Sequence, residues 1–225
     1  MLRIYEQTRA LPELLFEFGL SDATLWTMQN LTTQNLTTQN LNGYKVAVLA
    51  TDGFEESELT VPVRALLDAG AKVHVISPSG KKIQGFKHYD RSIRIDSDRK
   101  LDEIRPSEYD AVLLPGGALN ADALRTEPRA QEFIRAMNNG GKPIAVICHG
   151  AWLLVSADVV RNRQMTSWPS IADDIRNAGG KWEDQEVLVD RNLISSRKPA
   201  DLPAFCEAMI NVFSNIGILR GTVAA

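Results

Sequence analysis

The sequence predicts one α/β domain with a largely parallel sheet that is covered by helices on both faces. Two observations lead to this fold class. Short runs of aliphatic and β-branched residues alternate along the chain with segments of helical periodicity. Turns follow three of these runs, at Gly53, Gly116 and Cys148. Because ligands bind beyond the carboxyl ends of the strands in such sheets, the three turns are predicted to share one pocket.

The composition is that of an ordinary globular protein, with 225 residues and a formal net charge of −3. This charge gives no reason to expect nucleic acid or an anionic membrane as a partner. The two cysteines, Cys148 and Cys206, lie far apart and in no metal-binding spacing, which favours a reducing compartment. No apolar run is long enough to span a membrane, and no glycine-rich phosphate loop occurs. We therefore expect a cytoplasmic protein without a metal or other cofactor.

Residues 1–42 differ in composition from the rest of the chain. Three glutamates interrupt the apolar stretch that a signal peptide needs, although residues 11–20 are compatible with a short amphipathic helix. A polar pentapeptide that begins at Gln29 is then repeated, and so short a polar repeat cannot bury enough surface to fold alone. Residues 1–42 are interpreted as a partly disordered extension, with a true translation start near Met28 as the alternative. The folded domain is assigned to residues 43–225.

The first half of this domain begins with a buried strand predicted at residues 45–50. A turn and an acidic helix start follow, and the helix runs from Glu55 toward Leu67, where Gly70 ends it. Further strands in this half are predicted at residues 72–77, 91–96 and 110–114.

The second half begins with a helix that Pro128 opens and that Gly140 and Gly141 end. The elements predicted after it are a strand at 144–147, a helix from Ala151, a helix at 171–178, strands at 187–190 and 193–196, and a last helix from about Asp201.

Cys148 stands where a predicted strand turns abruptly into a helix. This is the nucleophile-elbow arrangement, with cysteine in place of serine. Free backbone N–H groups and the positive end of the helix dipole favour a thiolate at this point, so a lowered pKa is predicted for the thiol. A buried core cysteine is the alternative interpretation.

Several side chains and turns are predicted to surround Cys148. Glu55, Glu56 and Glu58 open the first helix, and one of these carboxyls is expected to meet the thiol, unless they only complement the helix dipole. The glycines Gly116 and Gly117 are candidates for oxyanion binding through their N–H groups, together with the amide after Cys148, which is that of His149. The imidazole of His149 is a possible base, with a surface histidine as the alternative.

Taken together, these segments resemble the PfpI family of the class I glutamine amidotransferase-like superfamily, which also contains the parkinsonism-associated deglycase. The resemblance covers about residues 44–217 in order, and the first 42 residues lie outside it. The matching segments are Ala50–Leu59, Leu113–Gly117, Ala145–Gly150, Thr166–Pro169 and Ser195–Leu202.

The resemblance implies a flavodoxin-like three-layer α/β/α sandwich with Cys148 as nucleophile and His149 beside it. The family's helix-start glutamate lies four residues before a proline, which gives Glu58, with Glu55 as the second choice. The third catalytic position of PfpI-type members is an acidic residue from a neighbouring subunit, and Asp122 is the matching residue. The loop here is one residue longer and carries Asp in place of Glu. A homodimer or a larger closed oligomer is therefore expected.

The resemblance leaves three activities open. Proteins of this family have been described as peptidases, as glyoxalases without a metal, and as deglycases, whereas the His-x-Glu pair of the amidotransferases is absent. We expect a cysteine-dependent enzyme that acts on small reactive carbonyls or glycated groups. An intracellular cysteine peptidase that uses Cys148, His149 and Asp122 is the alternative. A redox-sensing or chaperone-like stress protein, in which peroxide oxidises Cys148, is the alternative of another class.

Overall fold

The computed structural model describes the backbone of residues 40–223 and the side chains of residues 40–216. The predicted helix at residues 11–20 and the repeated pentapeptide lie outside the described residues. Leu41 is buried in the core, and its N–H donates to the carbonyl oxygen of Ala69 at 2.8 Å. The predicted domain boundary at residue 43 therefore falls inside a segment that packs on the domain.

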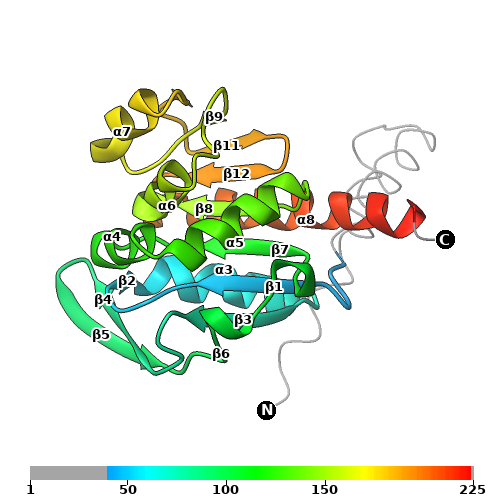
Figure 1. Ribbon diagram of the computed structural model, residues 1–225, viewed down its shortest axis with the longest axis horizontal. Helices are drawn as coiled ribbons and strands as arrows, with labels where there is room; N and C mark the ends of the chain where they lie inside the picture. The colour runs from blue at the N-terminus through cyan, green and yellow to red at the C-terminus, as the bar shows by residue number, and fades with distance from the viewer. Residues whose placement is uncertain (1–39, 224–225) are drawn as a thin grey trace, which may run out of the picture. The chain divides into compact units, whose positions relative to one another are not determined.

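A seven-stranded sheet forms the centre of the domain, in the order β11-β12-β8-β7-β1-β3-β6 (Figure 1). All neighbouring strands are parallel except β11 and β12, which run antiparallel. Most of these strands were predicted to within a residue because their aliphatic runs are buried on both faces. The strands are β1 (Lys45–Leu49), β3 (Lys72–Ser77), β6 (Arg99–Lys100), β7 (Ala111–Leu114), β8 (Ile144–Ile147), β11 (Val187–Asp190) and β12 (Leu193–Ser196).

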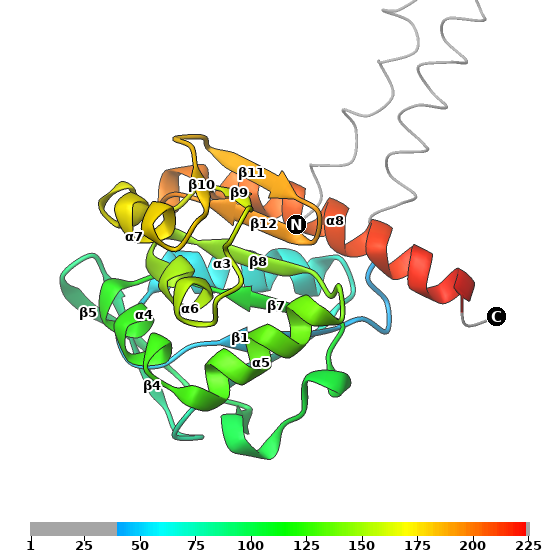
Figure 2. The ribbon, with the colours of Figure 1, turned by 45° about the horizontal axis from the view of Figure 1, so that its top comes forward.

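Helices cover the two faces of this sheet and give three layers (Figures 1 and 2). One face is covered by α3 (Glu56–Asp68) and α8 (Leu202–Val223), and the other by α4 (Ala118–Arg125), α5 (Pro128–Asn139), α6 (Ala151–Ser156) and α7 (Ala172–Asn177). A separate apolar cluster fills the space between the sheet and each helical layer. The predicted flavodoxin-like α/β/α sandwich is confirmed.

Two smaller sheets lie beside the main one. The first contains β2 (Phe54–Glu55), β4 (Ile83–Lys87) and β5 (Asp90–Ile95), and the second pairs β9 (Gln164–Met165) with β10 (Lys181–Trp182). The sequence analysis predicted β5 within one residue but missed β4 and α4. Gly85 interrupts the alternation of β4, and α4 has only eight residues, so neither produces a clear periodic pattern.

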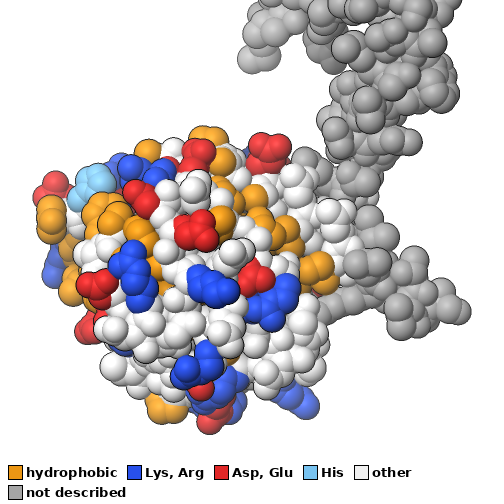
Figure 3. Space-filling model, turned by 90° about the horizontal axis from the view of Figure 1, so that it is seen from above, with side chains coloured by type: hydrophobic (Ala, Val, Ile, Leu, Met, Phe, Trp, Pro, Cys, Tyr) orange, Lys and Arg blue, Asp and Glu red, His pale blue; other side chains and the backbone are white. Residues whose placement is uncertain are grey.

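None of the described helices is long and apolar enough to cross a membrane. On the face drawn in Figure 3, acidic and basic side chains are intermixed with apolar ones. That face carries no extended patch of one charge, in keeping with the small formal net charge of −3.

Candidate active site

Cys148 occupies a sharp turn between β8 and α6. Its φ of 61° is in the left-handed region, which residues other than glycine rarely adopt. This backbone conformation costs on the order of 1 kcal/mol. The turn also runs close to other backbone, since a Cβ on Gly150 would lie 2.8 Å from the carbonyl oxygen of Leu114. This strained backbone holds the sulfur at the end of the sheet. The residue is 6% exposed.

Glu58 is fully buried in the first turn of α3. Its carboxyl and the Cys148 side chain lie against the same face of Gly116. A Cβ added to Gly116 would fall 2.2 Å from Glu58 Oε2 and 2.6 Å from Cys148 Cβ. Glycine is therefore required at position 116 for the carboxyl and the thiol to approach each other.

Burial raises the pKa of the Glu58 carboxyl to about 8, and the nearby negative charge of Glu55 acts in the same direction. The thiol of Cys148 and the N–H of Gly116 are close enough to oppose this shift, but neither makes a hydrogen bond of regular geometry with the carboxyl oxygens. Glu58 is therefore mostly protonated at neutral pH, and its O–H is available as a donor beside the sulfur.

The thiol pKa of Cys148 is raised above its ordinary value, first by burial and then by the negative charge of Glu58. The N–H groups of His149 and Gly117 act in the opposite direction. The prediction of a lowered thiol pKa was wrong, because it considered the elbow alone and not the buried carboxyl. The thiol and the carboxyl titrate as a coupled pair, and the pair keeps a proton on Glu58 at neutral pH.

His149 is held with its Nδ1 3.3 Å from Cys148 Sγ. Its ring packs edge-on against Trp152, with 5.3 Å between centroids, and stacks on Trp168 at 5.8 Å. Burial lowers the pKa of the imidazole, so His149 is neutral at pH 7 and can accept the thiol proton. The Nε1–H of Trp152 donates to Asp174 Oδ2 at 2.7 Å, which fixes one side of this aromatic clamp.

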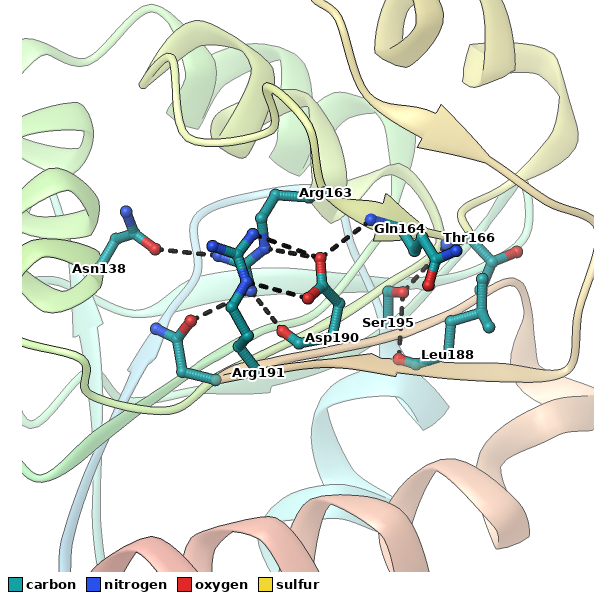
Figure 4. Close-up of polar contacts among 9 residues, drawn as sticks. Asn138, Arg163, Gln164, Thr166, Leu188, Asp190, Arg191 and Ser195 are labelled. Carbon is teal, nitrogen blue, oxygen red and sulfur yellow. Dashed lines mark hydrogen bonds and ion pairs between the residues drawn. The ribbon is translucent and has the colours of Figure 1, made fainter.

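The loop that carries Trp168 is attached at both ends. The N–H of Trp168 donates to the carbonyl oxygen of Cys148 at 3.3 Å. Earlier in the loop, the N–H of Thr166 donates to Ser195 Oγ on β12 at 3.0 Å (Figure 4). At its start, Arg163 makes a buried ion pair with Asp190, with 3.0 Å between Nε and Oδ2. The position of Trp168 in the pocket wall therefore depends on contacts made elsewhere in its loop, at Thr166 and Arg163.

A pocket of about 340 Å³ opens in front of the sulfur. Tyr89 lies at its rim with 96% of its surface exposed, and Glu55 accepts a hydrogen bond there from the N–H of His88 at 2.9 Å. None of the described residues that line it is a Lys or an Arg. The lining residues are Glu55, Glu58, His88, Tyr89, Gly117, Ala118, Cys148, His149, Trp168 and Pro199.

Residues 44–212 of the chain match the DJ-1/PfpI family. The chain belongs to the DJ-1/PfpI family. It is 47% identical over 163 residues to the Escherichia coli protein named protein/nucleic acid deglycase 2, a match that covers 72% of this chain and 92% of the relative. A Bacillus subtilis protein that carries the name of a cysteine protease, YraA, is 38% identical over 169 residues, with 75% and 97% covered.

The fold of this DJ-1/PfpI member also matches solved structures. The crystal structure of Drosophila melanogaster DJ-1beta is similar with a TM-score of 0.68 and 26% sequence identity, over 81% of this chain and 98% of that one.

Within this DJ-1/PfpI domain, some of the predicted site residues lie next to Cys148 and others do not. Glu58, Gly117 and His149 meet Cys148, whereas Glu55 lies at the pocket rim. The N–H of Gly116 faces the Glu58 carboxyl rather than the pocket, so this predicted oxyanion donor supports the carboxyl instead. The donors near the sulfur are the N–H groups of Gly117 and His149.

Asp122 is exposed on α4 and does not line the pocket. Within the described chain it makes no hydrogen bond with His149, so a role at this site requires a second subunit.

One further feature was not predicted. The tryptophans Trp152 and Trp168 hold His149, and the sequence offered no sign of this beyond the presence of the two tryptophans. Among the residues that the structure describes, no three His, Cys, Asp or Glu side chains are grouped closely enough to hold a metal ion.

Proposed function

We propose that this DJ-1/PfpI member is a cysteine-dependent enzyme that acts on reactive 2-oxoaldehydes and on their adducts with amines and thiols. One observation carries the proposal: a nearly buried sulfur lies between a carboxyl with a raised pKa and an imidazole at 3.3 Å, in a pocket of about 340 Å³. The name of the Escherichia coli relative, a deglycase, supports the same chemistry.

The first step joins the sulfur to the substrate. The neutral imidazole of His149 accepts the thiol proton, and the sulfur adds to the aldehyde carbon. The electron pair of the C=O bond moves to the oxygen, where the N–H groups of Gly117 and His149 stabilise it. Proton return to this oxygen gives a hemithioacetal. With an amine adduct, the sulfur instead displaces the amine, which leaves with its electron pair and gains a proton, and the same hemithioacetal results.

The second step needs a base and an acid but no oxidant. The carbon that bears sulfur gives up its proton to a base, and the neighbouring carbonyl carbon receives one. The hydroxyl proton likewise moves from the first oxygen to the second, so the hemithioacetal becomes a thioester of a 2-hydroxy acid. Glu58 and His149 are the groups in place to carry these protons. Water then cleaves the thioester, so methylglyoxal ends as lactate and the thiol is restored. No cofactor is required in this scheme.

A cysteine peptidase is the second candidate. It is favoured by the contact between Cys148 Sγ and His149 Nδ1 and by the name of the Bacillus subtilis relative. In that case Asp122 of a neighbouring subunit would orient His149 in a homo-oligomer. The 6% exposure of Cys148 is better suited to a small carbonyl than to an extended peptide.

The test compares purified wild-type protein with Cys148→Ala. We expect methylglyoxal loss, lactate formation and amine release from a glycated amino acid to fall by at least about 100-fold in the variant, because no other group provides the covalent bond. Cys206→Ala is the matched control, since Cys206 is half-buried on α8 and does not line the pocket. Equal rates in wild type and Cys148→Ala would reject the proposal, and cleavage of a fluorogenic peptide without carbonyl turnover would replace it with the peptidase.

A further inference from the structure

A polar cavity of about 250 Å³ lies at the end of the main sheet opposite to Cys148. The end of α5, the turn after α6 and the two-residue loop between β11 and β12 surround it. The carbonyl oxygen of Asn192, in that loop, accepts the N–H of Ile144 at the start of β8, whereas Cys148 follows the end of β8. The cavity and the catalytic pocket have no lining residue in common. The residues that line the cavity are Asn138, Asp158, Val159, Arg161, Arg163, Arg191 and Asn192.

Arg163 is the buried member of this lining, with only 6% of its side chain exposed. Its guanidinium donates to Asp190 Oδ2 at 3.0 Å, to Asn138 Oδ1 at 3.2 Å and to Asn192 Oδ1 at 3.1 Å (Figure 4). These bonds fix a positive charge at the cavity before any ligand arrives. A ligand that binds there therefore does not have to order this side chain, which lowers the cost of binding.

Arg161 and Arg191 carry the guanidinium groups that remain available. Their side chains are 66% and 64% exposed. Arg161 lies 3.8 Å from Asp158 and makes no side-chain hydrogen bond within the described chain. Arg191 donates to Asp190 through Nε and Nη2, at 3.0 and 3.4 Å, which leaves its Nη1 without an acceptor among the described residues. With three arginines and two aspartates, the cluster has a net positive charge and unused donors.

The backbone beside this cavity is strained in the same way as the backbone beside the catalytic pocket. Five of the described residues other than glycine have a positive φ. Two of them line the catalytic pocket, two line this cavity, and the fifth lies between two residues that line this cavity; in that order they are His88, Cys148, Asp158, Arg191 and Asn162. Arg191 has a φ of 57° in a two-residue hairpin loop, where glycine or asparagine is favoured. Because such conformations cluster at ligand-binding and active sites, an arginine in this position indicates a binding role for its side chain.

We infer that this cavity binds a phosphate group, either as free phosphate or at the end of a small molecule. The planar fork of a guanidinium matches the oxygens of a phosphate, and the donors here come from separate loops, so they approach from different directions. A tetrahedral phosphate can accept from all of them, whereas a carboxylate has only two oxygens in one plane. A volume of about 250 Å³ is below the range of about 300 to 1,000 Å³ that is usual for drug-sized ligands, so the ligand is small. The inference does not depend on the proposed function.

Binding is tested by titration calorimetry with inorganic phosphate and with glycerol 1-phosphate, at low ionic strength to limit screening. We expect phosphate to bind the wild-type protein with a Kd of about 1 mM or lower, and acetate to bind at least about 10-fold more weakly. Tighter binding of glycerol 1-phosphate than of phosphate would assign the site to a phosphorylated small molecule. Equal or weaker binding would assign it to free phosphate.

Substitution of the two exposed arginines tests the contacts. Arg161→Gln/Arg191→Gln should weaken phosphate binding at least about 10-fold, because two charge-assisted partners are lost. Arg161→Lys/Arg191→Lys should keep part of the affinity, since the charge remains without the planar fork. Arg64→Gln/Arg129→Gln removes the same charge from two exposed arginines on α3 and α5 that also pair with a neighbouring carboxylate, and it should bind phosphate like wild type. Urea unfolding confirms that each variant is folded.

Cys148→Ala tests the location of the site. This variant should bind phosphate like wild type, because the cavity lies at the other end of the sheet from the sulfur. Loss of phosphate binding in Cys148→Ala would place the phosphate in the catalytic pocket and overturn the inference. Equal weakening in the Arg64/Arg129 control, or binding of phosphate no tighter than that of acetate, would overturn it as well.

Discussion

Two buried polar clusters at opposite ends of β8 differ in how completely their polar atoms are paired. At the amino end, the Arg163 guanidinium donates to Asp190, Asn138 and Asn192, and every bond is between 2.5 and 3.2 Å (Figure 4). At the carboxyl end, neither oxygen of the buried Glu58 has a hydrogen bond of regular geometry. The Arg163 guanidinium thus finds its hydrogen-bond partners within the protein. The oxygens of Glu58, next to the nucleophile Cys148, do not.

The pKa shifts follow from this difference. Burial alone would raise the pKa of Asp190, but hydrogen bonds from Arg191 and from the N–H of Gln164, with the charge of Arg163, lower it. For Glu58 nothing of similar strength offsets burial, and the carboxyl stays protonated to about pH 8. A buried charge that is fully paired is therefore typical of a structural role. A buried carboxyl without partners lowers the stability of the fold, and such groups are typical of functional sites.

The largest expected effect comes from Glu58→Gln. Removing the acid and base group beside Cys148 should lower kcat/KM for methylglyoxal by about 10²- to 10⁴-fold. The same substitution should raise the stability of the folded protein at neutral and higher pH. Below the ordinary pKa of 4.5 the carboxyl is protonated in both the folded and the unfolded chain. Between 4.5 and about 8 only the folded chain keeps the proton, so the free energy of unfolding of wild type falls as the pH rises, and above 8 the loss is complete.

Glu58→Gln abolishes this loss because the amide does not ionise. Urea unfolding at pH 5 to 9 should show the variant gaining on wild type with rising pH, by up to a few kcal/mol. If the free energy of unfolding changed with pH in parallel for the two proteins, the prediction that Glu58 is buried with a raised pKa would be wrong.

Asp190→Ala should have the next largest effect, and mainly on stability. The Arg163 side chain, 6% exposed, would keep its charge without its carboxylate, which costs about 3 to 5 kcal/mol of unfolding free energy. Because this cluster is far from the sulfur, kcat/KM per folded molecule should fall by less than about 10-fold. Urea unfolding measures the free energy of unfolding. Turnover rates divided by the number of active sites, from titration of Cys148, give kcat/KM per folded molecule.

Arg191→Gln is the matched control for that pair, since Arg191 also contacts Asp190 but its side chain is 64% exposed. Its loss should lower the free energy of unfolding far less than the loss of Asp190 does, because solvent screens an exposed ion pair. An equal cost for both variants would show that the buried pair is no more important than a surface pair.

Gly116→Ala should produce the smallest stability change of the three and tests the contact between the thiol and the carboxyl. The new methyl group would fall 2.2 Å from Glu58 Oε2, so the two side chains must separate, at a cost of about 1 to 3 kcal/mol. The pH dependence of carbonyl turnover should shift as well, because the pair is no longer coupled. Gly140→Ala, whose Cβ would meet no atom closer than 3.3 Å, is the control and should change neither measurement appreciably.

The sequence by itself determined the strands of the main sheet and the position of the elbow. Buried parallel strands are continuous aliphatic runs, and such runs can be read locally at residues 45–50, 110–114 and 144–147. The choice of Glu58 over Glu55 was also available, though only from the resemblance to the family.

Tertiary structure alone decided the chemistry of these residues. Whether Glu58 ionises depends on the groups that surround it, and those come from the turns at Gly116 and Cys148, 58 and 90 positions further along the chain. The direction of the thiol pKa was predicted wrongly for this reason, since burial and a neighbouring carboxyl are not local properties. The grouping of Arg161, Arg163 and Arg191 around one cavity likewise arises only in the folded chain, because these residues come from segments on either side of α7.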